Sequence, residues 1–260
     1  VVPSIDTSNT AIIYGDKYFF KLFRKLDPGL NPDLELVRYL SEKTEFANCP
    51  PYGGSLGVGE MTDPNYLNLG MLSGKVDNRG DAWEYFQELT ARYFTTEEKV
   101  DEETLSRARL LGQRTAEMHH ALAQGTGDIL KPTPLTADYR AEITTAAKKL
   151  LDRQVTELRA KIPALSPEIQ ETANRVLDLE LSLNERLASL ADQEMELDLI
   201  RIHADYHLGQ VLVTDDDFVI IDFEGEPLLS IPERRRRRPA LKDVAGMVRS
   251  FHYAANAQLL

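Results

Sequence analysis

The segment Leu199–Pro227, LIRIHADYHLGQVLVTDDDFVIIDFEGEP, decides how this 260-residue sequence is interpreted. The tripeptide His203-Ala204-Asp205 is followed by Gln210, five residues after the aspartate, and Asp222 ends the second of two apolar runs. This spacing matches the pattern H-x-D-x-x-x-x-N followed by D-F-G, which is typical of phosphoryl transfer. Gln210 stands at the Asn position of that pattern, and Glu224 stands at the Gly position.

Local structure agrees with this pattern. Alternating or continuous apolar residues predict strands at 199–203, 210–214 and 218–222, the last two joined by an acidic turn. Asp205 would then lie on a loop, where a carboxylate can accept the proton of an attacking hydroxyl, while Gln210 and Asp222 would hold Mg²⁺ against the phosphates of ATP. The alternative is a surface hairpin with acidic turns, since an aspartate after a strand is often only a turn former. The complete combination favours a kinase.

Bulk properties exclude several other classes. A net charge of −12 argues against nonspecific nucleic-acid binding, which needs clustered positive charge. The single cysteine, Cys49, cannot form an internal disulfide, which fits a reducing, cytoplasmic environment. No apolar run approaches the ~20 residues of a membrane-spanning helix. A hydrophobic content of 42% with 28% charged residues is ordinary for a globular protein.

The first part of the chain predicts a small, strand-rich lobe. Strands at 11–14 and 17–23 flank Gly15-Asp16, a suitable two-residue hairpin turn. A helix is expected from Asn31-Pro32 to about residue 45, with Asn31 as its N-cap. A second hairpin is expected from strands at 54–60 and 66–76.

The rest predicts a mostly helical lobe. Residues 77–80 look like the connection between lobes, and helices are expected at 81–94, 102–123, 137–161, 167–190 and 241–260. The fold class is therefore α+β and bilobal, like a protein kinase. Its N-lobe would be 1–76, and its C-lobe would be 81–260, carrying the catalytic loop 203–210 and the metal-binding segment 222–227.

Lys21 and Glu35 are the candidate residues on the nucleotide side. Lys21 lies in the second predicted strand, where a kinase lysine contacts the α- and β-phosphates, and Glu35 in the next helix is its expected partner. Taken alone, an exposed strand lysine and an acid favoured by the helix dipole would explain both residues. The downstream motif favours the functional interpretation. His203 is expected to brace the catalytic loop.

Several segments resemble bacterial maltokinases, which belong to the aminoglycoside-phosphotransferase-like kinases. They are HADYHLGQVL, IDFEGEP, LKDVAGMVRSFHYAA, SNTAIIYGDKYFFKLFRKLDPGLNPDLE and NRGDAWEYF. One position departs from the family pattern: Ala204 replaces a glycine, and alanine should not take the φ > 0 conformations open to glycine. We expect this replacement to be tolerated.

The resemblance implies transfer of the γ-phosphate of ATP, with Mg²⁺, to the anomeric hydroxyl of maltose, giving maltose 1-phosphate. It places Ser8, Asn9 and Thr10 over the nucleotide phosphates and makes Asp243 an anchor of the catalytic loop. It also implies a cap before residue 1, further sequence after residue 260 and an association with trehalose synthase. No nucleic-acid or membrane partner is expected.

The acceptor side is predicted least directly. The candidate sugar contacts are His207, Glu224, Glu226, Arg234 and Arg236. The five arginines at 234–238 are expected to border the site by pairing with nearby glutamates or phosphate, and a solvated charged loop is the alternative. Two other functions remain open: a phosphotransferase for aminoglycosides or another small alcohol, and a catalytically silent nucleotide-binding module that regulates a trehalose synthase.

Overall fold

The computed structural model describes residues 9–96 and 100–257, which form two compact units. The first unit contains Val1–Pro132 and Leu199–Leu260, and the second contains Thr133–Asp198. The predicted C-lobe, 81–260, therefore includes a separately packed unit that the sequence did not reveal. The lobe boundary at 77–80 stays a prediction. None of the helices in the described ranges is long and apolar enough to cross a membrane.

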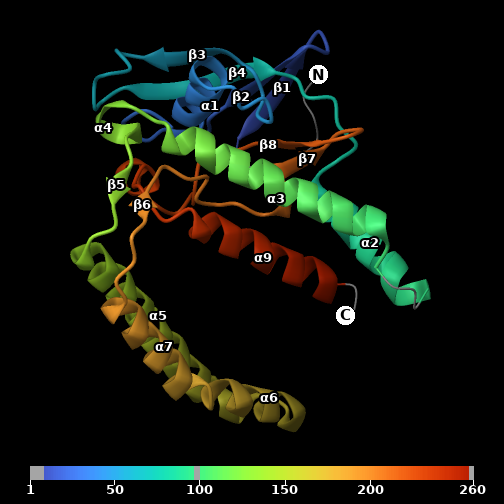
Figure 1. Ribbon diagram of the computed structural model, residues 1–260, viewed down its shortest axis with the longest axis vertical. Coiled ribbons are helices and arrows are strands. Elements are labelled where there is room, and N and C mark those ends of the chain that lie inside the picture. Colours follow the sequence, from blue (N-terminus) through green and yellow to red (C-terminus); the bar gives the residue numbers. More distant parts are fainter. Residues whose placement is uncertain (1–8, 97–99, 258–260) are drawn as a thin grey trace. The chain divides into compact units, whose positions relative to one another are not determined.

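The first unit begins with a four-stranded antiparallel sheet in the order β1-β2-β4-β3 (Figure 1). Its strands are β1 (Thr10–Tyr14), β2 (Tyr18–Leu22), β3 (Tyr52–Val58) and β4 (Leu67–Gly74). The β1–β2 turn is the predicted one, because Gly15 and Asp16 have φ values of 55° and 56°. Lys21 lies opposite Ala11 and Met71, on a strand with neighbours on both sides.

Helix α1 (Pro32–Lys43) begins where the sequence predicts. The Asn31 side chain accepts a hydrogen bond from the Asp33 backbone N–H, and Pro32 occupies the first turn, where a missing N–H has no consequence. Leu34, Leu36 and other apolar residues of α1 are buried in the core. The acids of the first turn are withdrawn from solvent as well, since Asp33 is 2% exposed and the Glu35 side chain 9%.

The remaining elements of the first unit support the hairpin of β7 (Val211–Val213) and β8 (Phe218–Ile220). They are α2 (Ala82–Thr96), α3 (Glu102–Ala123), α4 (Gly127–Leu130), the 3₁₀ turn η2 (Leu208–Gln210), α8 (Ile231–Arg234) and α9 (Leu241–Asn256). In Figure 1 the sheet and α1 gather at one end of this unit, with the hairpin between them and α9. Residues 258–260 of the predicted last helix lie outside the described residues.

One predicted strand is wrong. Only Leu199 of the segment 199–203 belongs to a strand, β6 (Asp198–Leu199), and Ile200 makes an isolated bridge to Arg238. The backbone of His203 instead hydrogen-bonds a buried carboxylate. The β7–β8 hairpin confirms the other two predicted strands, and it is joined on one side to Asn48, whose carbonyl accepts from Ile220 N–H at 2.8 Å.

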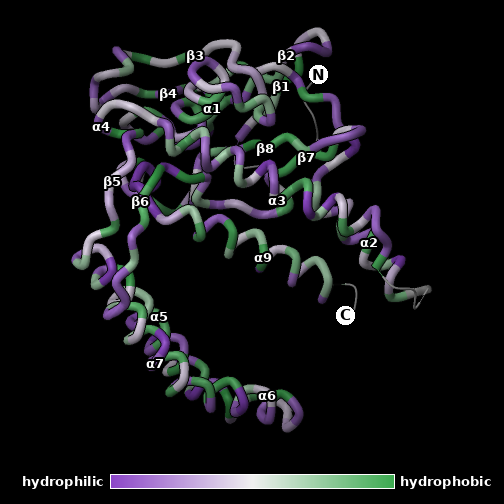
Figure 2. Tube along the Cα trace, viewed as in Figure 1, coloured by the Kyte–Doolittle hydropathy of each residue, from purple (hydrophilic) through white to green (hydrophobic). Residues whose placement is uncertain are grey.

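The second unit is helical and contains α5 (Ala137–Lys161), η1 (Ile162–Ala164), α6 (Pro167–Leu177) and α7 (Glu180–Asp192). The predicted helix 167–190 is in fact two helices, broken around Asp178–Leu179, so that α7 packs back against α5. Figure 2 shows hydrophobic and hydrophilic residues mixed along these helices. The short strands β5 (Thr133–Pro134) and β6 pair where the chain enters and leaves this unit.

Candidate functional site

A buried aspartate on α9 holds the loop that carries Asp205. The two carboxylate oxygens of Asp243 accept hydrogen bonds from the backbone N–H groups of His203 and Ala204, each at 2.9 Å. The same carboxylate lies 2.9 Å from Nε2 of His119 on α3. Asp243 is only 1% exposed, so these partners replace the water that its charge has lost. The predicted anchoring role of Asp243 agrees with this geometry.

The rest of α9 follows the loop along one helical face. Gly246 allows close approach, because a Cβ atom there would lie 2.7 Å from the carbonyl oxygen of Tyr206. One turn later, Ser250 Oγ accepts from the backbone N–H of Leu208 at 3.1 Å. On the other side, the Tyr206 and Thr115 hydroxyls are 2.9 Å apart. The loop is thus fixed at several successive residues by elements far away in sequence.

His203 connects this loop to the segment that follows β8. Its Nε2 atom lies 2.9 Å from the carbonyl oxygen of Ile221, and its ring packs against Tyr206 and Phe223 at centroid distances of 5.2 and 4.9 Å. His203 is fully buried. These contacts agree with the predicted bracing role of His203.

Ala204 corrects one sequence-based expectation. Its φ is 72°, in the left-handed region that alanine was expected to avoid. The reason lies in the contacts on both sides: its N–H donates to Asp243, and its carbonyl accepts from Lys242 Nζ at 3.3 Å. Tertiary hydrogen bonds therefore hold a backbone conformation that is unfavourable for this residue type.

The structure brings together the two predicted metal ligands. The backbone N–H of Ile221 donates to the carbonyl of Gln210 at 3.0 Å, which sets the two strands side by side. The Gln210 side chain lies close enough to the Asp222 carboxyl to help lower its pKa. Asp222 has a φ of 65°, so the chain turns sharply at this residue.

Lys21 lies among three carboxylates. Its Nζ atom is 2.9 Å from Asp33, 2.6 Å from Asp222 and 2.6 Å from Glu224. One carboxylate oxygen from each of these three acids lies within 4.8 Å of the others, a spacing that would suit a cation bound by oxygen ligands. We call Lys21, Asp33, Asp222 and Glu224 the carboxylate cluster. Its donor set fits Mg²⁺, which prefers oxygen ligands.

Electrostatics within the cluster separates the pKa values of its members. Burial acts to lower the pKa of Lys21, but the attraction of Asp33, Asp222 and Glu224 outweighs it and holds that pKa well above its ordinary value. Burial acts to raise the pKa of Asp222, yet the charge and hydrogen bond of Lys21 lower it overall. Burial raises the pKa of Glu224, and the nearby carboxylates of Asp222 and Asp33 add to that effect. Of Asp222 and Glu224, the carboxylate of Asp222 is thus the more firmly ionised.

The predicted partner of Lys21 is wrong. Glu35 does not bind Lys21 but pairs with Arg201 and Arg235, whereas Asp33, two residues earlier on α1, takes Lys21. Two helix positions differ by about 200° in direction, so only one of these acids can face Lys21. Asp33 also accepts from the backbone N–H of Phe223 at 2.9 Å. Asp33 was not predicted, although it lies in the same helical turn as Glu35.

Two of the other predicted residues, Asn9 and Arg234, contact Glu224. Asn9 donates from its amide to Glu224 Oε1 at 2.6 Å, Thr10 begins β1, and Ser8 lies outside the described residues. Arg234 is buried, with its guanidinium 3.3 Å from the Glu224 carbonyl oxygen and 3.4 Å from Asp27.

On the acceptor side, His207 Nδ1 accepts from the backbone N–H of Gly209 at 3.1 Å. Asp205 is partly exposed, and Glu226 and Arg236 are exposed. The roles assigned to these residues in binding nucleotide and sugar stay predictions.

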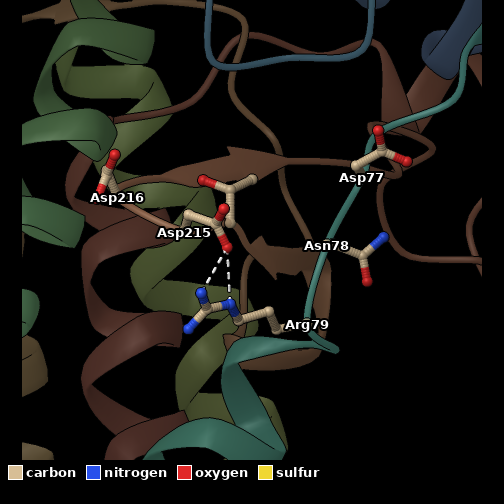
Figure 3. A pocket seen from close by; sticks show the side chains of 6 residues that line it. Asp77, Asn78, Arg79, Asp215 and Asp216 are labelled. Carbon is tan, nitrogen blue, oxygen red and sulfur yellow. Dashed lines mark hydrogen bonds and ion pairs between the residues drawn. The ribbon is translucent and has the colours of Figure 1, made fainter.

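A separate hollow of about 360 Å³ lies where residues 77–79 meet the β7–β8 turn (Figure 3). Arg79 closes it with an ion pair to Asp215 at 2.7 Å, and its backbone N–H donates to the Val213 carbonyl at 2.8 Å. The lining residues are Asp77, Asn78, Arg79, Thr214, Asp215 and Asp216, all outside the carboxylate cluster. The hollow therefore lies at the junction between the predicted connection 77–80 and the β7–β8 hairpin, and none of the predicted catalytic, metal-binding or phosphate-binding residues lines it.

Comparison with known proteins identifies the family to which this site belongs. The phosphotransferase enzyme family (APH) matches residues 5–225. A glucosamine kinase from Streptacidiphilus jiangxiensis is 29% identical over 254 residues, which are 96% of this chain and 53% of that protein. A glucosamine kinase from Mycolicibacterium smegmatis is 43% identical over 53 residues, 20% of this chain and 13% of that protein.

Solved structures agree with the sequence matches. A glucosamine kinase in complex with glucosamine, ADP and inorganic phosphate superposes with a TM-score of 0.78 at 26% identity, over 96% of this chain and 58% of that one. Crystal form B of a glucosamine kinase gives a TM-score of 0.79 at 25% identity, over 100% and 58%. The chain thus spans between half and three fifths of the relatives that it matches along its length, and the predicted protein-kinase-like fold is confirmed.

The broad resemblance predicted from the sequence is confirmed, while these relatives carry the name glucosamine kinase and not maltokinase. With its loop aspartate, its paired Gln210 and Asp222 and its strand lysine, the chain belongs to the phosphotransferase enzyme family.

Proposed function

We propose that this protein is a sugar kinase that transfers the γ-phosphate of ATP to a hydroxyl of a small sugar. The observation that carries the proposal is the joint placement of two features. Asp205 lies on a loop fixed by Asp243, and the same loop ends at Gln210, which contacts Asp222 beside Lys21. A base and a phosphate-binding centre on one rigid support are what phosphoryl transfer requires, because it depends mainly on positioning and charge.

Each residue has a distinct role in this proposal. Asp205 accepts the proton of the sugar hydroxyl, and Lys21 and Asn9 contact the ATP phosphates, with Ser8 and Thr10 nearby in sequence. Gln210 and Asp222 would hold Mg²⁺, as their oxygen donors suit this ion. When bound, the ion supplies positive charge against the phosphates. Lys21 would then exchange part of its contact with Asp222 and Glu224 for phosphate oxygens.

Glucosamine is the first candidate acceptor. The two relatives described above and the solved complex carry glucosamine in their names, and the longer sequence match covers 96% of this chain. The charge of the protein supports an aminosugar, since a net charge of −12 attracts an ammonium group. The exposed Glu226, within the predicted metal-binding segment 222–227, is the candidate contact for such a group.

Maltose is the second candidate, favoured by the segments HADYHLGQVL and IDFEGEP. Its product would be maltose 1-phosphate, which feeds α-glucan synthesis, and an association with trehalose synthase belongs to this alternative alone. Phosphorylation at the anomeric hydroxyl locks the sugar ring. Loss of reducing-end reactivity should therefore follow ADP formation, whereas transfer to any other hydroxyl leaves the reducing end intact.

The deciding experiment incubates the protein with ATP and Mg²⁺ and, separately, glucosamine, N-acetylglucosamine, maltose, glucose and one aminoglycoside, and follows the products by ³¹P NMR. We expect a new phosphate-ester resonance with glucosamine and a much weaker one with N-acetylglucosamine, which lacks the positive charge. Asp205→Asn serves as the catalytic control. A resonance with maltose alone would select the second acceptor, and one with the aminoglycoside alone would select that class. Nucleotide binding without an ester from any acceptor would contradict the proposal and indicate a silent module.

A further inference from the structure

Glu35 joins three segments that are far apart in the sequence. It lies in the first turn of α1, and both of its carboxylate oxygens are engaged. Oε1 accepts from Arg235 Nη2 at 2.6 Å, and Oε2 accepts from Arg235 Nε at 3.2 Å and from Arg201 Nη1. The side chains of Glu35 and Arg201 are 9% and 1% exposed. We call Glu35, Arg201 and Arg235 the Glu35 cluster.

The two arginines lead directly to the catalytic loop. Arg201 precedes His203 by two residues, at the start of the loop that carries Asp205. Arg235 follows α8 and lies three residues before Arg238, whose backbone exchanges hydrogen bonds of 2.7 and 3.1 Å with Ile200. Both arginines therefore lie on the two segments that pair through the backbones of Ile200 and Arg238, where the catalytic loop begins. Glu35 is the carboxylate on α1 that contacts both arginines.

The same helical turn also holds the phosphate side of the site. Asp33 binds Lys21 Nζ and the backbone N–H of Phe223, each at 2.9 Å. Asp33 and Glu35 thus attach one rigid helix to two parts of the site: Asp33 to the carboxylate cluster, and Glu35 to the arginines beside the start of the catalytic loop. A displacement of α1 would change the distance between these two parts.

Glu35 faces an excess of positive charge. Nε and Nη2 of Arg201 are buried and have no hydrogen-bond partner among the residues that the structure describes, so Glu35 provides the hydrogen bond shown for this guanidinium. Buried ion pairs of this kind are weak contributors to stability compared with apolar side chains of similar volume, but they can fix one geometry. This makes a positioning role a better explanation of the cluster than stability alone.

We propose that Glu35 is a positioning residue that, through Arg201 and Arg235, sets the place of the Asp205 loop relative to the nucleotide side. The inference rests on the proposed kinase function and concerns how its site is assembled. Weakening the Glu35 cluster should therefore lower kcat, because Asp205 is misplaced, while KM for ATP stays near its original value, because Asp33 and Lys21 remain paired.

Arg235→Gln tests this inference best. Glu35→Gln would leave Arg201 buried without a counter-charge and could prevent folding, whereas Arg235 is 21% exposed and its removal leaves the Glu35–Arg201 pair in place. Arg38→Gln is the matched control, since Arg38 lies on the same helix and pairs with Glu42, but on an exposed surface. Arg235→Lys keeps the charge and loses the two-bond geometry.

For Arg235→Gln we expect a fall in kcat of about tenfold, which corresponds to ~1.4 kcal/mol, with KM for ATP changed less than about twofold. Arg235→Lys should recover part of kcat, and Arg38→Gln should behave like the unmodified protein. A folded Arg235→Gln protein with unchanged kcat would overturn the inference, and so would an equal effect in Arg38→Gln.

Hydrogen exchange provides a second measurement that needs no turnover. In Arg235→Gln, amides of 199–206 should exchange at least about tenfold faster, while those of α3 stay protected. If no sugar is phosphorylated by the unmodified protein, the proposed function fails but this measurement still decides the inference. Unchanged exchange at 199–206 would refute it, and faster exchange there and not in Arg38→Gln would support it.

Discussion

The catalytic loop and the carboxylate cluster lie next to each other but are held in opposite ways. Along the loop, the backbone N–H groups of His203, Ala204 and Leu208 all reach protein acceptors supplied by α9. The carboxylate cluster instead places three acids around one ammonium group, with Arg234 3.9 Å from Glu224 as a further cation. These backbone donors of the loop already have acceptors within the protein, whereas the cluster carries excess negative charge.

This difference separates two requirements of the proposed reaction. A base that must accept a proton from one particular hydroxyl benefits from a fixed position before the substrate arrives. A centre that must receive a metal ion and phosphates benefits from charges that are only partly balanced. Changes in the cluster should therefore alter ligand and metal dependence, and changes around the loop should alter kcat or stability without altering metal dependence.

Asp222→Asn should have the largest effect and abolish turnover. The amide keeps the shape of the side chain but supplies no charge to the metal, and it weakens the pairing with Lys21 at 2.6 Å. ADP release should fall to background at all Mg²⁺ concentrations, with a circular dichroism spectrum like that of the unmodified protein. Phosphoryl transfer near the original rate would show that Asp222 is not a metal ligand.

Asp205→Asn should lower kcat by ~10²–10⁴-fold, the usual contribution of a general base. Because Asp205 is assigned to the acceptor hydroxyl and not to the nucleotide, KM for ATP and the Mg²⁺ dependence should change little. Steady-state kinetics with varied ATP at saturating sugar measures both constants. A variant whose main defect is weak ATP binding would place Asp205 on the nucleotide side and remove the contrast between the two regions.

Lys21→Ala should raise KM for ATP by ~10- to 100-fold, the range expected when a charged hydrogen bond is lost, and also lower kcat. Without the ammonium group, the carboxylates of Asp33, Asp222 and Glu224 repel one another, so the variant should unfold at lower temperature and regain stability when Mg²⁺ is added. Lys21→Arg should rescue little, because the planar guanidinium differs in reach and shape. Thermal unfolding of Lys21→Ala with and without MgCl₂ tests the predicted recovery of stability. An unfolding temperature that does not change with Mg²⁺ would contradict the assignment of the cluster as a cation site.

Local signals predicted most of the elements that surround these two regions. The Gly15-Asp16 turn, the Asn31-Pro32 start of α1 and both ends of α5 follow from residue types within a few positions. The break between α6 and α7 does not, because the sequence around Asp178 contains neither proline nor glycine, and packing of α7 on α5 requires a turn there.

The sequence predicted most residues of the site but not which acid of α1 pairs with Lys21. The spacing of Asp205, Gln210 and Asp222 follows from one continuous segment, so the sequence alone indicated their roles. The choice between Asp33 and Glu35 depends on Phe223 and Arg201, which lie 190 and 166 residues away along the chain. No local pattern contains that information, since both acids suit the first turn of a helix equally well.

Ala204→Gly should have the smallest effect, and two opposing terms decide its sign. Alanine at φ 72° costs ~1–2 kcal/mol relative to an ordinary backbone conformation, and glycine removes that cost. Glycine also makes the unfolded chain more flexible, which costs ~0.4–1 kcal/mol of stability. The expected result is a gain of less than ~1.5 kcal/mol in the free energy of unfolding, since the hydrogen bonds of Asp243 and Lys242 hold the same backbone in both proteins.

Chemical denaturation measures the change, with Ala116→Gly on the exposed face of α3 as the matched control. That control should lose ~0.5–1 kcal/mol, because it carries the flexibility of glycine without relieving strain. A loss of stability in Ala204→Gly equal to that of the control would mean that the loop does not hold Ala204 in a strained conformation. The fixed loop would then depend less on α9 than the hydrogen bonds of Asp243 indicate.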